Sequence, residues 1–115
     1  MLPAPTSGLT LHIRRTDDGA LVQCCGMLVA GVADLLYSEA KPLTSESRRV
    51  VLDFTELTHI DSMGIGTLVR LYVTAKSAGC ELQFINLGRR IRELLGVTHL
   101  LSVFSVVGEQ GIKLP

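Results

Sequence analysis

The chain has 115 residues, of which 47% are hydrophobic and 19% are charged. These values are typical of one globular domain and exclude a disordered chain. Its 11 basic and 11 acidic residues give a formal net charge of zero. Because nucleic-acid-binding domains usually carry a strong positive charge, no nucleic-acid partner is expected.

The sequence shows no sign of export, membrane insertion or metal binding. No apolar stretch approaches the ~20 residues that a membrane-spanning helix needs, and MLPAPTSG lacks the basic flank and apolar core of a signal peptide. The odd number of cysteines indicates reduced thiols, so we expect a cytoplasmic protein. We predict neither a metal nor a cofactor. The cysteines and histidines do not have the spacing of metal ligands: Cys24, Cys25, Cys80, His12, His59 and His99.

The first half of the chain predicts a hairpin and a helix. Residues 9–15 alternate, with Leu9, Leu11 and Ile13 on one face, as in a half-buried strand. TDDG at 16–19 is a turn signal in which Gly19 is free to take positive φ. A second strand follows from Ala20. Residues 32–40 predict a helix that ends near Pro42.

The second half predicts alternating strands and helices. VVLDF at 50–54 is typical of a buried strand. After a loop, residues 62–78 predict a helix whose inward positions are Ile65, Leu68, Val69 and Tyr72, with Gly79 just beyond its end. Further elements are expected at 80–87 (strand), 89–95 (helix, stopped at residue 96) and 102–107 (strand).

These elements predict a single α/β domain, a mixed sheet of about four to five strands with helices packed on it. We expect the domain to cover residues 9–107, between a flexible N-terminal segment at 1–8 and a tail at 108–115.

Ser62 lies where a loop leads into a predicted helix, and two enzymatic interpretations are disfavoured. A hydrolase nucleophile would need G-x-S-x-G, but the first glycine is replaced by Ile60 and only His59 or His99 could act as base. An aspartyl phosphoacceptor at Asp53 would need further acidic ligands and a lysine. We therefore predict no catalytic residue and interpret Asp53 as a carboxylate that accepts backbone N–H bonds from the next loop.

Two other interpretations of Ser62 remain open. Asp61 and Ser62 are both preferred residues for capping a helix. A serine at a helix N-terminus is also a favourable phosphorylation site, because the unpaired N–H groups and the helix dipole tolerate negative charge there. Gly64 and Gly66 weaken the first turns by roughly 1 kcal/mol each, which close approach of another backbone would explain.

The segment VVLDFTELTHIDSMGIGTLVRLYVTAKSAGCELQFINL closely resembles the signature region of the STAS domains, the bacterial anti-sigma factor antagonists and their relatives. The resemblance extends from Leu9 to Val103 and implies the STAS-type fold. It implies that Ser62 is the phosphoacceptor, with Asp61, Gly64 and Gly66 as motif partners. The implied partner is a histidine-kinase-like anti-sigma factor, which would supply the ATP and release the phosphorylated protein.

The chain departs from the family pattern in two places. Met63 replaces the usual second serine of the motif. Where the family often carries Gly-Glu-Leu-Asp, this chain has Gly26 followed by Met27, Leu28 and Val29, so two carboxylates are missing from the expected partner surface. These apolar residues also suit a permanent interface. An unphosphorylated STAS scaffold in a lipid-transport or signalling complex is therefore the alternative hypothesis, and a homodimer is a further expectation.

Overall fold

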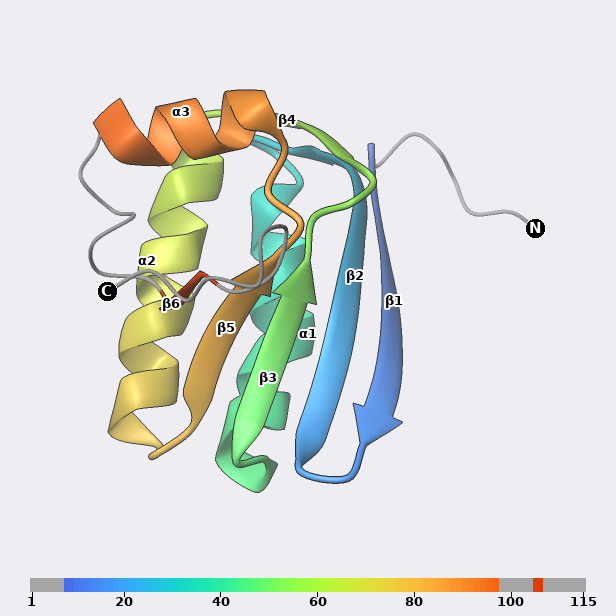
Figure 1. The fold of residues 1–115 in the computed structure, drawn as a ribbon, viewed down its shortest axis with the longest axis vertical. Helices are drawn as coiled ribbons and strands as arrows, with labels where there is room; N and C mark the ends of the chain where they lie inside the picture. Colours follow the sequence, from blue (N-terminus) through green and yellow to red (C-terminus); the bar gives the residue numbers. More distant parts are fainter. Residues whose placement is uncertain (1–7, 98–104, 107–115) are drawn as a thin grey trace.

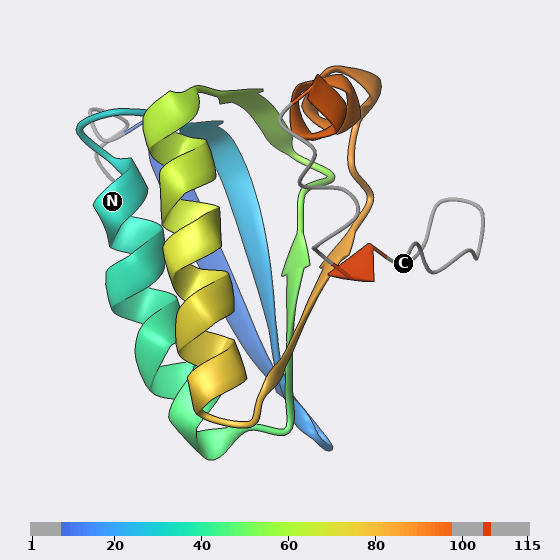
Figure 2. The same ribbon diagram turned by 90° about the vertical axis from the view of Figure 1, so that its left-hand side faces the viewer.

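The computed structural model describes residues 8–97 and 105–106. Its strands form one mixed sheet in the order β1-β2-β3-β5-β6, with β4 pairing β2 beyond the end of β3. Helices α1 and α2 lie side by side on one face of this sheet, and α3 lies at the end of the sheet next to β4 (Figures 1 and 2). The predicted α/β class is confirmed, with three helices accompanying the sheet.

The N-terminal hairpin consists of β1 (Leu9–Thr16) and β2 (Gly19–Leu28), paired antiparallel. The predicted turn is correct, but Gly19 does not take positive φ. Glycine is needed there for space, because a Cβ would lie 1.7 Å from the carbonyl oxygen of Arg49. The inward face of β1 is also shorter than predicted: Leu9 is buried, whereas Ile13 remains 40% exposed on this edge strand.

Helix α1 (Ala33–Glu46) continues past Pro42, so the predicted end was wrong. A proline inside a helix removes one backbone hydrogen bond. The helix nevertheless continues because the next residues, Leu43 and Thr44, are buried. The Thr44 hydroxyl donates to the carbonyl oxygen of Lys41 at 2.7 Å, which helps to satisfy the helix end.

The segment between residues 54 and 61, predicted as a loop, contains an additional strand. After β3 (Arg49–Asp53) the chain leaves β2 for three residues and then rejoins it as β4 (Leu57–Ile60). Strand β2 changes its parallel neighbour between Gln23, which pairs with β3, and Gly26, which pairs with β4; the register then shifts within the β2–β4 pairing, between Gly26 and Met27. Strand β4 therefore leads directly into the start of α2.

Helix α2 (Ser62–Ser77) matches the prediction, and Gly79 takes the expected positive φ of +74°. Its buried stripe is rotated from the predicted one: Leu68 is buried as expected, but Ile65, Val69 and Tyr72 are only half-buried. The fully buried positions are Gly64, Thr67, Leu68, Leu71 and Ala75.

The remaining elements follow the predicted order. They are β5 (Glu81–Ile85), α3 (Arg89–Val97) and β6 (Ser105–Val106). Helix α3 continues through residue 96, the glycine that was expected to stop it. Helix ends commonly vary by one or two residues, so this difference is small. The rest of the last predicted strand and both terminal segments lie outside the described residues.

The core between the sheet and the helices is mainly aliphatic. Leucine and valine side chains from β2, β3, α1 and α2 fill it, and Phe54 packs edge-on against Phe84 with their ring centroids 5.9 Å apart. Across the part of the chain that the structure describes, every helix falls short of the length and apolar character required to cross a bilayer.

The backbone contact at Gly19 generates a stability prediction. Gly19→Ala should lower the free energy of unfolding by about 1–3 kcal/mol, because the new methyl group collides with rigid backbone. The matched control is Gly88→Ala, where a Cβ meets no atom within 4 Å and φ is not positive. Urea denaturation monitored by circular dichroism measures both changes; equal stability of the two variants would contradict the explanation.

Candidate functional site

The candidate site is built around Asp61, the residue that joins β4 to α2. Its backbone is extended, and its side chain caps the helix by accepting a hydrogen bond from the Gly64 N–H at 2.9 Å. The second carboxylate oxygen accepts from the Ala30 N–H at 3.0 Å, in the loop between β2 and α1. One carboxylate therefore holds together two loops that are 31 residues apart in sequence.

These hydrogen bonds also change the acidity of Asp61. The N–H groups of Ala30 and Gly64 favour the charged carboxylate and hold the pKa of Asp61 below its usual range. The group is therefore ionised at neutral pH, and its two bonds are charge-assisted. This arrangement confirms the capping role predicted for Asp61.

Gly64 is required by the close approach of α2 to β2. A Cβ at this position would lie 2.0 Å from the carbonyl oxygen of Leu28 and 2.8 Å from a side-chain carbon of Ile60. Glycine at position 64 is therefore explained by packing within the chain. Gly66, in contrast, is exposed, and a Cβ there would meet no atom within 4 Å. Nothing in the chain's own described packing requires glycine at position 66.

Ser62 is exposed at the first position of α2, and Met63 beside it is 59% exposed. Both line a small groove of about 140 Å³ between the start of α1 and the start of α2. Most other lining residues have short side chains or none, so few side chains project around Ser62: Ala30, Gly31, Ala33, Gly66 and Thr67.

A charged pair is also among the residues that line this groove. Arg70 of α2 lies 3.4 Å from Asp34 of α1, and its guanidinium stacks 4.2 Å from the centre of the Tyr37 ring. The Tyr37 hydroxyl lies 2.8 Å from the Thr74 hydroxyl, and the two share a hydrogen bond. These contacts tie α1 to α2 roughly two to three helical turns beyond Ser62. Sequence patterns do not reveal them, because Asp34 and Arg70 are 36 residues apart.

The residues at and after the end of β2 that were predicted to contact a partner lie in two different environments. Met27 is 39% exposed and Val29 is half-buried, so both reach the surface. Leu28 has no exposed area, because alternation along the strand turns it toward the helices. Its inclusion in a partner-binding surface therefore needs correction: Leu28 is a core residue, and its contribution is the carbonyl oxygen that Gly64 packs against.

The interpretation of Asp53 as a structural carboxylate is confirmed. Its Oδ1 accepts hydrogen bonds from the Thr55 N–H at 2.9 Å, the Thr55 hydroxyl at 2.6 Å and the Asn86 amide at 3.1 Å. Burial raises its pKa, but hydrogen bonds from Thr55, Asn86 and Gln23 outweigh this and leave the pKa lowered. These partners hold the turn between β3 and β4.

The structure also places other groups that the sequence analysis considered. His59 is exposed on β4, with Nδ1 3.0 Å from the Thr58 hydroxyl, and His99 lies outside the described residues. Cys24 is buried, which raises its pKa to about 12, and burial also raises the pKa values of Cys25 and Cys80. Within residues 8–97 and 105–106, no three His, Cys, Asp or Glu side chains gather in a way that could hold a metal ion.

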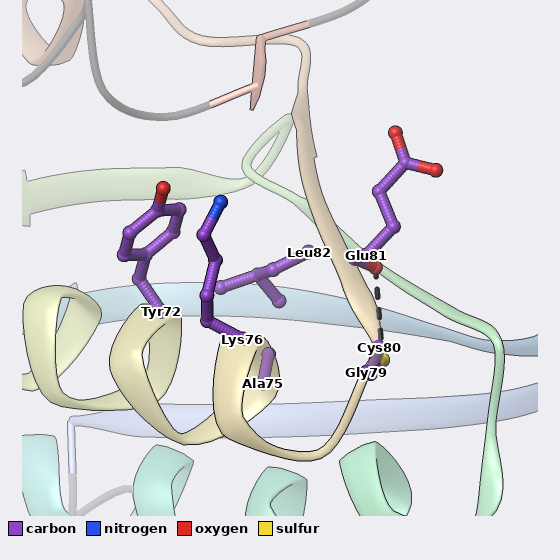
Figure 3. A pocket seen from close by; sticks show the side chains of 7 residues that line it. All are labelled: Tyr72, Ala75, Lys76, Gly79, Cys80, Glu81 and Leu82. Atoms are coloured by element: carbon purple, nitrogen blue, oxygen red, sulfur yellow. Dashed lines mark hydrogen bonds between the residues drawn. The ribbon is translucent and has the colours of Figure 1, made fainter.

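A larger hollow of about 410 Å³ lies at the opposite end of α2 (Figure 3). Tyr72 and Lys76 extend along one side of it, and the side chain of Leu82 points from β5 toward them. The Cys80 thiol donates to the Glu81 carbonyl oxygen at 3.7 Å. None of the predicted site residues lines this hollow, so its size alone does not make it the functional site.

Comparison with known proteins identifies the family. A model of the STAS domain matches residues 11–111, and the chain belongs to the STAS domain family. A relative from Bordetella bronchiseptica, named "Putative anti-sigma factor antagonist BtrV", is 30% identical over 95 residues, which cover 81% of this chain and 82% of the relative. The family assignment agrees with the expectation that the chain is not an enzyme.

Solved structures show the same fold. An anti-sigma factor antagonist from Mycobacterium paratuberculosis superposes with a TM-score of 0.78 at 19% identity, covering 91% of this chain and 89% of that one. The antagonist SpoIIAA in its unphosphorylated form gives a TM-score of 0.72 at 12% identity, covering 88% and 90%. The phosphorylated form of Bacillus SpoIIAA gives 0.67, covering 88% and 94%. The predicted STAS-type fold is thus confirmed.

The bridging carboxylate generates a pH prediction. Asp61→Asn should keep one acceptor oxygen for the Gly64 N–H but put an NH2 donor where the Ala30 N–H needs an acceptor, and it also removes the negative charge. It should therefore be less stable than the wild type at pH 7. Because the folded pKa of Asp61 is lowered, its stabilisation is present above the unfolded pKa of about 4 and is lost as the pH falls through the folded value.

The two proteins should therefore converge in stability under acid conditions. Urea unfolding between pH 7 and pH 2.5 measures this difference, with Asp17→Asn in the exposed hairpin turn as the control. A stability difference that stays constant over this pH range would contradict the role assigned to the charge.

Proposed function

We propose that this chain is an anti-sigma factor antagonist whose binding to a histidine-kinase-like anti-sigma factor ends when Ser62 is phosphorylated. The observation that carries the proposal is the exposed Ser62 at the N-terminus of α2, next to an aspartate that fixes the helix start. The named relatives and one structural neighbour known in a phosphorylated form support it. The free cysteines are consistent with action in the cytoplasm.

The local geometry suits a protein substrate that must be phosphorylated without unfolding. An exposed hydroxyl can enter the active site of another protein, and the helix N-terminus tolerates the roughly −1.5 to −2 charges that phosphorylation adds. The partner would supply ATP and Mg²⁺ as well as the catalytic groups. Asp61, Met63, Gly66, Met27 and Val29 are the residues we assign to the contact surface around Ser62, with Gly64 shaping the helix start.

Phosphorylation would end binding by electrostatics and bulk rather than by unfolding. A partner surface fitted against the uncharged Ser62 meets a dianion at the same point, where burying charge without a counter-ion is costly. The complex would therefore dissociate while both proteins stay folded.

The first test concerns the phosphosite. Ser62→Ala should keep the fold and partner binding but resist release by ATP, whereas Ser62→Asp should bind more weakly, by about tenfold or more. The anti-sigma factor is first captured with Ser62→Ala as bait. Calorimetry then gives the affinities, and mass spectrometry of protein from its own cells locates phosphoryl groups. Unmodified Ser62 under all growth conditions, with equal binding by Ser62→Asp, would favour the scaffold alternative.

The second test concerns Gly66. Gly66→Ala should retain or slightly raise stability, by up to ~1 kcal/mol, because alanine favours a helix and the site is open. The added methyl group should nevertheless weaken partner binding if another backbone approaches at this position. Thermal unfolding and calorimetry separate the two effects, with the exposed Val73→Ala on the same helix as a control. Unchanged affinity would remove Gly66 from the contact surface.

A further inference from the structure

A second hollow lies on a different part of the molecule, between β4 and α3. Its volume is about 430 Å³, and its walls come from His59 and Ile60 of β4 and from Arg90, Glu93 and Leu94 of α3. Figures 1 and 2 show α3 next to β4, apart from the α1–α2 pair. The hollow is therefore distinct from the groove that contains Ser62.

Arg90 lines this hollow and Arg89 precedes it in the first turn of α3; we call these two residues the basic rim. Arg89 and Arg90 are exposed in the first turn of α3, and neither takes part in the ion pairs found among the described residues. Glu93 is the one carboxylate that lines the hollow in the described part of the chain. The first turn of α3 contains no acidic residue. Because cations at a helix N-terminus oppose the helix dipole, helix stability does not explain these arginines.

Apolar surface adjoins this basic rim. Leu94 is half-buried within the hollow, and Ile60 closes its inner side. Met27 of β2 is paired in register with His59 and is 39% exposed. A partner that fits this surface must present both an apolar side chain and negative charge, since either feature alone leaves half of the surface unmatched.

We propose that the surface formed by Met27, His59, Arg89, Arg90 and Leu94 docks an acidic segment of a protein partner, with an apolar side chain of that segment in the hollow. The proposal rests on the proposed function, because it takes the partner to be the same protein that binds around Ser62. Residues 59 and 60 are followed directly by Asp61 and Ser62, so β4 leads from the docking surface to the phosphosite. Charge matching at α3 would then orient the partner over the serine.

A test that needs no kinase uses a phage library of random twelve-residue peptides. The library is selected on the unphosphorylated wild-type protein. Binding of the enriched peptides is then measured to Arg89→Glu/Arg90→Glu and to the control Arg14→Glu/Arg48→Glu. Both pairs are exposed arginines, so the two variants have the same net charge. Glutamate is favourable in the first turn of a helix, so the α3 variant should fold normally.

Enriched peptides should be acidic with at least one large apolar residue. They should bind the α3 variant about tenfold more weakly than the wild type and bind the control variant unchanged. Enrichment of basic peptides, equal loss in both variants, no enrichment, or displacement of the peptides by an equimolar single-stranded oligonucleotide would overturn the proposal. Because Ser62 is unmodified throughout, these outcomes are independent of whether a kinase ever phosphorylates it.

Discussion

The two hydrogen bonds of the Asp61 carboxylate are the interaction on which the rest of the candidate site depends. They connect the loop that begins α1 to the first turn of α2. The backbone N–H of Asp61 itself donates to the Leu28 carbonyl oxygen at 3.3 Å, so the same residue also continues the pairing with β2. This bridge and the contacts of Arg70 and Tyr37 between α1 and α2 together hold the two sides of the groove. The ionised carboxylate thus turns two separate loops into one surface.

The side of the α2 start that faces the core is closely packed, so it tolerates few substitutions. Gly64 lies against the Leu28 carbonyl oxygen, and Leu28 fills the core beneath it. On the outer side, Ser62, Met63 and Gly66 are exposed and meet few neighbours. The rigid inner side and accessible outer side suit a hydroxyl that another protein must reach and modify, because the backbone can stay fixed while the charge at the surface changes.

The two surfaces differ in size and in the residues that line them. Around Ser62 the groove has a volume of about 140 Å³ and is lined mostly by small residues, with the Asp34–Arg70 pair among them. Around α3 the hollow has a volume of about 430 Å³, is partly apolar, and is lined by both Arg90 and Glu93. A single partner that spans both would gain orientation from the second surface and sensitivity to phosphorylation from the first. This division would allow the switch at Ser62 to change affinity while the α3 contact maintains specificity.

The sequence by itself determined the order of the main elements, a capped helix start at Asp61 or Ser62, and the family. Local patterns carried this information: alternation in the hairpin, the apolar run of β3, and the helical spacing of α2 with its terminal Gly79. These signals are strong because they depend on contacts that recur every two to four residues. Asp53 could likewise be interpreted correctly, since its main partner, Thr55, is two residues away.

Only the tertiary structure decided the features that rest on distant contacts. Strand β4 has just four residues, and it exists because they pair with β2, about 30 residues earlier in the chain. Pro42 stays inside α1 because burial of Leu43 and Thr44 outweighs the lost hydrogen bond. The sequence could not separate buried Leu28 from exposed Met27, nor bring His59 to Arg90. Burial and charge pairing between remote segments depend on the folded arrangement, which local periodicity does not encode.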